Sequence, residues 1–130
     1  MPGTRKTLLL VDPHSLFRRT VAMVARELDL AEVQEASSLE AAQRMMEQQP
    51  FDGLLLDIDA DSLASFQLVQ MLREGQLRSA ADIPVALSAE AVDAVLLELF
   101  KPLQIRRLML KPFKVKTALE VVSALAGHGH

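Results

Sequence analysis

The sequence of 130 residues contains no cysteine, no tryptophan and no tyrosine. Without cysteine the chain cannot form a disulfide framework or a thiolate metal site, which suits a reducing, cytoplasmic location. The chain has no apolar run long enough for a membrane span, and its start lacks a signal-peptide core. The net charge of -3 provides no basic field of the kind that attracts nucleic acid, so we expect no direct nucleic-acid contact.

The sequence does contain enough apolar residues for one core. Hydrophobic residues make up 50% of the chain and charged residues 24%, which is typical of one globular domain of this length. We expect this domain to span residues 1–126. Residues 127–130 read Gly-His-Gly-His and lack any periodicity, so we interpret them as a linker stub or a cloning remnant rather than a metal site.

Short apolar runs alternate with helical segments along the whole chain. Four runs are continuous, which is typical of parallel strands buried on both faces. These runs are Leu8–Val11, Leu54–Leu56, Ile83–Leu87 and Leu108–Leu110. A fifth strand is predicted at Glu32–Ala36, where polar and apolar residues alternate as they do at a sheet edge. The pattern predicts an α/β fold with a doubly wound, five-stranded parallel sheet and helices on both faces.

Two helical segments allow more specific predictions, one about where a helix begins and one about what covers a helix. Ser37 followed by Glu40 fits a capping box, which predicts that the second helix begins at Ser37. The segment 91–100 contains more apolar residues than one sheet can bury. Its helix either faces a partner or is a core helix partly covered by a neighbouring loop.

Four polar residues lie at the ends of predicted strands: Asp12, Asp57, Ser88 and Lys111. Because the carboxyl ends of parallel strands meet at one edge of a sheet, we expect these side chains to converge. One aspartate at a strand end is most often a helix cap, but four polar residues in matching positions are harder to explain in that way. The set suits phosphoryl capture, in which Asp57 attacks phosphorus while Mg²⁺, a lysine and a hydroxyl hold the phosphoryl oxygens.

Taken together, these motifs resemble the receiver domains of two-component response regulators. The matching segments are Leu10–Asp12, His14–Arg18, Phe51–Asp57, Ile83–Ala89 and Leu110–Phe113. The resemblance implies the flavodoxin-like strand order 2-1-3-4-5 and a signalling module rather than an enzyme. It implies a histidine kinase or a phosphotransfer protein as the phosphodonor. Output would pass through a partner or a homodimer contact of the fourth helix, the last strand and the last helix.

The resemblance also implies a role for each residue near this edge. Asp57 is the phosphoacceptor, and Ser88 and Lys111 bind the phosphoryl group. Asp12, Asp57 and the backbone carbonyl of Asp59 bind Mg²⁺.

Two positions depart from the family pattern. Pro13 stands where the family usually has a second acidic residue, so the site lacks one anionic ligand and magnesium binding is expected to be weakened. Leu108 occupies the switch position, where the family often has a tyrosine or a phenylalanine that turns inward. Leucine packs there but cannot repeat that rearrangement.

Three further residues near this edge have open roles. Asp59 and Asp61 either supply a replacement carboxylate for the metal or form an acidic, solvated turn, which is the commoner use of aspartate. His14 is most simply an exposed residue at the start of the first helix rather than a ligand.

Three functions remain open from the sequence. The first is a receiver module that takes a phosphoryl group on Asp57. The second is a degenerate pseudo-receiver that acts as a phosphorylation-independent interaction domain, motivated by Pro13 and Leu108. The third is a haloacid-dehalogenase-like phosphatase, because Leu54–Asp59 resembles the nucleophile motif of those enzymes. Such enzymes need a later acidic pair for magnesium, and no aspartate follows Asp93.

Overall fold

The computed structural model describes residues 5–128 and contains a five-stranded parallel sheet in the order β2-β1-β3-β4-β5. The strands are β1 (Thr7–Val11), β2 (Glu32–Ala36), β3 (Gly53–Asp57), β4 (Val85–Ala89) and β5 (Arg107–Leu110). The helices are α1 (Ser15–Glu27), α2 (Leu39–Gln48), α3 (Ser62–Arg73), α4 (Ala94–Phe100) and α5 (Val115–Leu125), with a 3-10 turn, η1, at Lys101–Leu103. The predicted doubly wound α/β fold and its strand order are confirmed. Residues 129 and 130 of the predicted C-terminal stub lie outside the described residues.

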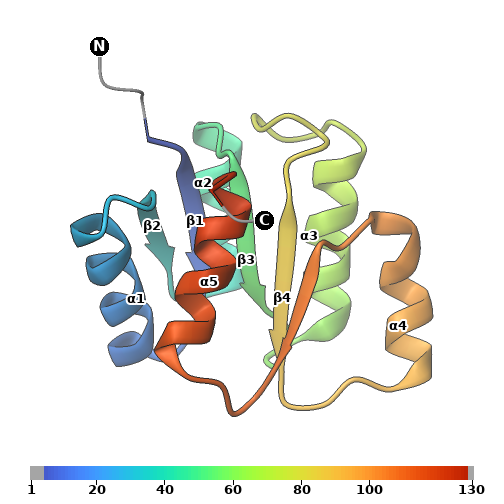
Figure 1. Ribbon diagram of the computed structural model, residues 1–130. Coiled ribbons are helices and arrows are strands. Elements are labelled where there is room, and N and C mark those ends of the chain that lie inside the picture. Colours follow the sequence, from blue (N-terminus) through green and yellow to red (C-terminus); the bar gives the residue numbers. More distant parts are fainter. Residues whose placement is uncertain (1–4, 129–130) are drawn as a thin grey trace.

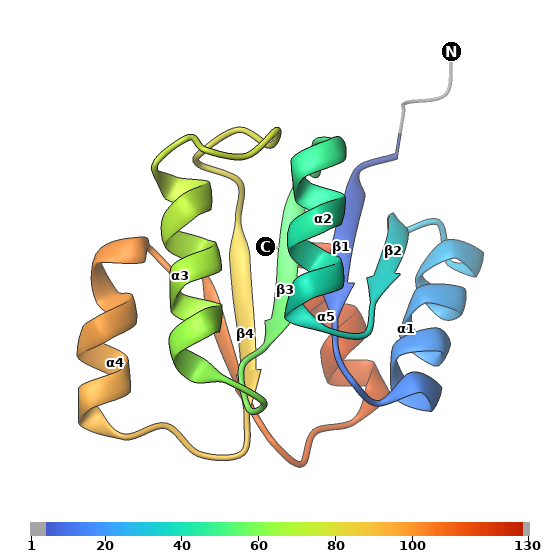
Figure 2. The same ribbon diagram turned by 180° about the vertical axis from the view of Figure 1, so that it is seen from behind.

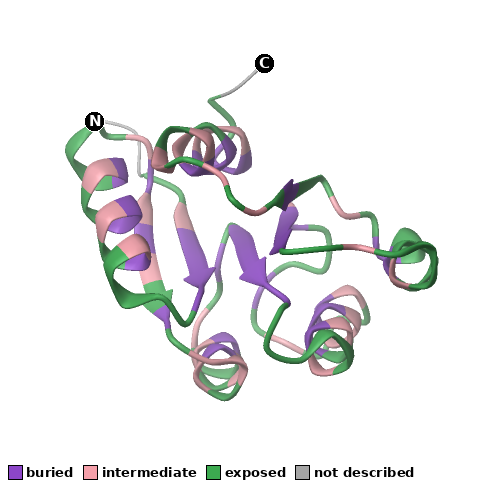
Figure 3. Cartoon of the chain, turned by 90° about the horizontal axis from the view of Figure 1, so that it is seen from below, coloured by how far each residue is buried: buried purple, intermediate pink, exposed green. Residues whose placement is uncertain are grey.

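Helices cover both faces of the sheet (Figure 1, Figure 2). One face carries α1 and α5, and the other carries α2 and α3. Successive residues of a strand point to opposite faces, so Leu54 and Leu56 join the core beneath α2 and α3, whereas Leu55 joins the core beneath α1 and α5. A strand between two helical layers therefore needs an apolar residue at every position, which explains the continuous run in β3. Figure 3 shows the buried central strands between helices whose outer surfaces are exposed.

The strand β5 differs from the prediction that all four continuous runs are buried on both faces. It lies at the edge of the sheet, and Met109 is its only buried residue. Leu108 and Leu110 are exposed by 36% and 55%. An apolar run of three residues does not distinguish an edge strand from a central one. Either kind of strand can carry such a run where a partner or a helix lies nearby.

The predicted capping box at Ser37 was wrong by one residue. The N-cap of α2 is Ser38, whose hydroxyl accepts a hydrogen bond from the backbone N–H of Ala41 at 3.1 Å. Both serines have suitable side chains, and only the backbone geometry selects between them. The helix therefore begins at Leu39.

The helix α4 packs with one side only. Phe100 is buried, and Val92 and Leu96 pack partly against the core, but Val95 and Leu97 are exposed by 78% and 51%. Figure 2 shows α4 at the end of the helical layer, beyond α3. That a partner covers its exposed side stays a prediction. None of the described helices is both long and apolar enough to cross a membrane.

Candidate functional site

The carboxyl ends of β1, β3 and β4 form a rim at the lower edge of the sheet in Figure 1. Asp57 is the last residue of β3 and pairs in register with Ser88 of β4. Asp12 follows β1, whose last residue Val11 pairs with Leu56. All three polar residues are buried, with Asp12 exposed by 2% and Asp57 by 5%. The structure therefore brings together the two carboxylates and the hydroxyl that the sequence places at one edge.

Lys111 follows β5 and reaches across the rim. Its Nζ donates hydrogen bonds to Oδ2 of Asp57 at 2.5 Å and to Oδ2 of Asp59 at 2.7 Å. Burial alone would lower the pKa of Lys111, but the hydrogen bonds and charges of the two carboxylates outweigh it and raise this pKa above the usual range. The ammonium group therefore stays protonated and neutralises part of the negative charge at the rim.

The side chain of Asp59 joins the loop after β3 to the loop after β4. The backbone N–H of Glu90 donates to its Oδ1 at 2.9 Å and to its Oδ2 at 3.2 Å. Burial would raise the pKa of Asp59, but the contacts with Lys111 and the Glu90 amide lower this pKa below its usual range. The backbone N–H of Asp59 also donates to Oδ1 of Asp57 at 2.9 Å. The Asp59 carboxylate thus accepts hydrogen bonds from two donors at the edge of the rim, the Glu90 amide and the Lys111 ammonium.

Asp61 does not turn toward the rim. Its Oδ1 accepts a hydrogen bond from the backbone N–H of Ala64 at 2.9 Å and caps α3. The buried hydroxyl of Ser65 donates to the backbone carbonyl of Asp61 at 2.8 Å. The turn-forming interpretation therefore describes Asp61, whereas the side chain of Asp59 contacts the rim.

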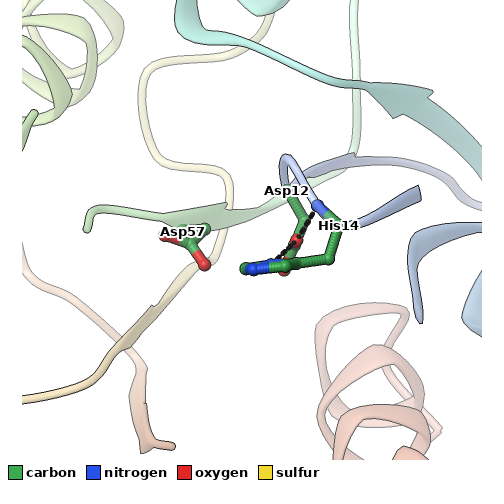
Figure 4. A group of neighbouring side chains, drawn as sticks. All are labelled: Asp12, His14 and Asp57. Carbon is green, nitrogen blue, oxygen red and sulfur yellow. Dashed lines mark hydrogen bonds and ion pairs between the residues drawn. The ribbon is translucent and has the colours of Figure 1, made fainter. Parts of the chain in front are cut away.

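His14 is exposed, as predicted, but its imidazole lies at the rim. Its Nδ1 is 2.9 Å from Oδ1 of Asp12, and its backbone N–H donates to the same oxygen at 2.7 Å. One ligand atom each from Asp12, His14 and Asp57 lie within 4.8 Å of one another. Figure 4 shows the imidazole extending toward Asp57. The sequence signal for this placement was the spacing of two residues from Asp12, across a turn that Pro13 favours.

Arg18 supports Asp12 from α1. Its Nη1 donates to the backbone carbonyl of Asp12 at 2.8 Å, and its Nε donates to Glu35 of β2 at 3.1 Å. The side chain is only 11% exposed. From the sequence we placed Arg18 in a matching segment but gave it no role, although Arg18 precedes Val21 by three positions and so shares its sheet-facing side of the helix. The contact fixes the loop that carries Asp12.

Leu108, the predicted switch position, lies on β5 opposite Leu87 of β4. It borders a cavity of about 420 Å³ between α4 and β5, whose lining includes Ile58 and Leu96. Leu108 is 36% exposed, so its side chain belongs to the open edge of the sheet rather than to the buried core. Its role in switching stays a prediction.

We compared the sequence with models of protein families. A family model described as the response regulator receiver domain matches residues 8–123. The chain belongs to this family. Receiver domains are signalling modules of two-component systems, as the rim motifs predicted. A comparison with curated proteins gives no significant match.

Solved receiver structures share the fold. The chemotaxis protein CheY4 of Vibrio cholerae superposes with a TM-score of 0.77 at 18% identity, covering 94% of this chain and 99% of that one. A response regulator from Thermotoga maritima gives 0.75 at 23% identity, covering 95% and 98%. The HemR receiver domain of Leptospira biflexa gives 0.78 at 20% identity, covering 95% of each chain. At these identities the similarity shows the fold alone.

Proposed function

We propose that Asp57 accepts a phosphoryl group from a phosphohistidine of a histidine kinase or a phosphotransfer protein. A carboxylate oxygen of Asp57 attacks phosphorus, a P–O bond forms as the P–N bond breaks, and the imidazole nitrogen leaves with the bonding electron pair. The observation that carries the proposal is the environment of Asp57. Its carboxylate is 1% exposed, contacts the ammonium of Lys111 and lies in register with Ser88.

Lys111 and Ser88 supply the contacts that the transferred group needs. A phosphoryl group brings several acceptor oxygens and about -1.5 to -2 of charge. The Nζ of Lys111, now bound to Asp57 and Asp59, would pair with one phosphoryl oxygen, and the hydroxyl of Ser88 would donate to another. Because Lys111 follows β5 and Ser88 lies in β4, phosphorylation would pull on two neighbouring strands.

The residues present fit the Mg²⁺ ion that the family uses. Asp12 and Asp57 would hold it together with the backbone carbonyl of Asp59. The side chain of Asp12 is 3% exposed, and among residues 5–128 no lysine or arginine nitrogen lies within 4.0 Å of its carboxylate. A buried carboxylate without such a partner favours a cation. Bound magnesium supplies positive charge between carboxylate and phosphoryl oxygens.

The output surface in this proposal is the face formed by α4, β5 and α5. Val95, Leu97 and Leu110 expose apolar side chains on α4 and β5. Such exposed apolar groups favour contact with a partner protein or with a second copy of the chain. Phosphorylation of Asp57 would bias two conformations of this face and so regulate that contact.

Incubation with a small-molecule phosphodonor and Mg²⁺, followed by intact-mass measurement, tests the proposal. We expect wild type to gain the mass of one phosphoryl group and Asp57→Asn to gain none. Asp52→Asn is a matched control, because Asp52 lies at the other end of β3 and accepts a hydrogen bond from the backbone N–H of Thr7. An unmodified wild type, or an adduct that persists in Asp57→Asn, would refute the proposal.

A phosphorylation-independent receiver is the second candidate function. The metal site lacks one acidic ligand because residue 13 is proline, and the ammonium of Lys111 is already bound to the carboxylate of Asp59. In that case wild type stays unmodified in the same experiment, and Asp57→Asn binds its partner with the affinity of wild type.

A further inference from the structure

The rim carries an imidazole beside the position where the family pattern has a second acidic side chain. Pro13 has no ligand atom to offer, and the next residue, His14, places a ring nitrogen near both buried carboxylates. Figure 4 shows this imidazole between the loop after β1 and the end of β3, where Asp57 lies. The metal site therefore has a nitrogen donor available in place of the missing carboxylate.

We propose that His14 is a ligand of a metal ion bound by Asp12 and Asp57, and that this ligand set shifts the preference of the site from Mg²⁺ toward first-row transition ions such as Co²⁺. The inference rests on the proposed phosphoryl site, because it uses the same two carboxylates. It adds a ligand residue to the set that the resemblance implies.

The three ligand atoms lie close to the spacing that one ion needs. Metal–ligand bonds to nitrogen and oxygen are about 2.0–2.2 Å long, so two ligands of one ion lie at most about 4.4 Å apart. The observed separations lie within 4.8 Å. The side chain of His14 is 67% exposed, whereas those of Asp12 and Asp57 are 3% and 1% exposed. The exposed imidazole, rather than the two buried carboxylates, would therefore move to close the site around an ion.

The state of Asp12 points independently to a cation. Its Oδ1 accepts from the backbone N–H of His14, and its Oδ2 accepts no hydrogen bond from any residue in the described range 5–128. The other buried carboxylate at the rim, Asp57, differs from Asp12 because it contacts the ammonium of Lys111. Asp12 thus has one oxygen that accepts no protein hydrogen bond and that is still reached from the rim, so a metal ion could bind to it.

The chemistry of the donors sets the preference. Mg²⁺ is a hard ion that favours oxygen and loses its water reluctantly, so an imidazole replaces a carboxylate poorly for this ion. Imidazole suits zinc, copper, nickel and related ions, whose affinity for a mixed nitrogen and oxygen site follows their position in the transition series. Loss of the imidazole should therefore weaken Co²⁺ binding much more than Mg²⁺ binding.

Titration of the full chain with Co²⁺ and with Mg²⁺, in separate experiments without a phosphodonor, tests the inference. The chain contains three histidines. The reference variant replaces His128 and His130 by alanine, so that the C-terminal histidines bind no metal. The test variant adds His14→Ala. Calorimetry gives each affinity, and the visible absorption of Co²⁺ reports whether an imidazole is bound.

We expect His14→Ala to weaken Co²⁺ binding by about tenfold or more, to change Mg²⁺ affinity by less than about twofold and to alter the Co²⁺ spectrum. If His14 only pairs with Asp12, its removal instead leaves the Co²⁺ spectrum unchanged and changes both affinities by the same factor or not at all. Either result would overturn the inference. Because no phosphoryl transfer takes place in this titration, its failure is separate from a failure of Asp57 to accept phosphate.

Discussion

The ammonium of Lys111 is shared between two carboxylates, at 2.5 Å from Oδ2 of Asp57 and 2.7 Å from Oδ2 of Asp59. The second of these also accepts hydrogen bonds from the backbone N–H of Glu90. An anionic side chain therefore already holds donors that a phosphoryl group on Asp57 would use. A phosphoryl group that engages Lys111 competes with Asp59 for the charge of its ammonium group, so Asp59 opposes phosphorylation.

Replacement of Asp59 by asparagine should favour binding of a phosphoryl mimic. Asparagine removes the charge that competes for Lys111 but keeps the backbone carbonyl of residue 59 in place. We expect Asp59→Asn to bind beryllium trifluoride roughly three- to tenfold more tightly, since a partly exposed ion pair contributes about 1 kcal/mol. Asp61→Asn is the matched control, because asparagine caps α3 as well as aspartate does. Equal affinities of all three proteins would contradict this role of Asp59.

The stability of the metal-free protein should depend on pH through Asp59 and Lys111. The pKa of Asp59 is lowered, so its contribution is complete above the ordinary pKa of about 4 and is lost as the pH falls through the lowered value. The pKa of Lys111 is raised, so its contribution is complete below about pH 10 and is lost as the pH rises through the raised value. Denaturant unfolding between about pH 2 and pH 6 should show a shallower acid loss of stability in Asp59→Asn. Parallel curves for the two proteins would refute this assignment.

Restoring an acidic residue after Asp12 should strengthen magnesium binding. Pro13 is exposed in the loop after β1, so an aspartate side chain has room there. An added negative charge about 4 Å from a divalent ion contributes roughly 2 kcal/mol even with the dielectric constant of water. We expect Pro13→Asp to tighten Mg²⁺ binding by about tenfold or more, as measured by calorimetry. Pro13→Ala, which removes the ring without adding charge, separates this effect from a change in the backbone, and equal gains in both variants would contradict it.

Leu108 should contribute little to stability despite its place in a strand. Leu87 is its partner in register and is buried, whereas Leu108 is 36% exposed. We expect Leu108→Ala to lower the free energy of unfolding by about 1 kcal/mol or less and Leu87→Ala to lower it by about 2–5 kcal/mol. Denaturant unfolding of both variants measures the difference. A large loss in Leu108→Ala would show that this residue is part of the core.

The sequence predicted the central part of the fold well. The continuous run in β3 has one physical cause, burial on two faces, so this pattern predicts the strand directly. The mixed polar and apolar pattern of β2 predicted an edge strand, and β2 is at the edge, although its buried residues Val33 and Ala36 lie on opposite faces. The run in β5 did not reveal that its strand lies at the edge, because an exposed leucine and a buried one look alike in sequence. Glu40 favoured Ser37 as the cap of α2, whereas the backbone geometry makes Ser38 the cap.

At the rim, the sequence placed Asp12, Asp57, Ser88 and Lys111 together because parallel strands end at one edge of the sheet. It could not say which way the loop side chains turn. Asp59 and Asp61 have the same carboxylate, yet one contacts Lys111 and the other caps α3. The difference depends on backbone dihedral angles that no residue type specifies by itself.

Chemical mapping of the phosphorylated residue tests the central claim most directly. Borohydride reduces an aspartyl phosphate to homoserine, and the tryptic peptide of residues 45–73 contains Asp52, Asp57, Asp59 and Asp61. After treatment with a phosphodonor and a divalent ion, we expect homoserine at position 57 and unchanged aspartate at the other three positions. Homoserine at another aspartate, or at none, would contradict phosphorylation of Asp57.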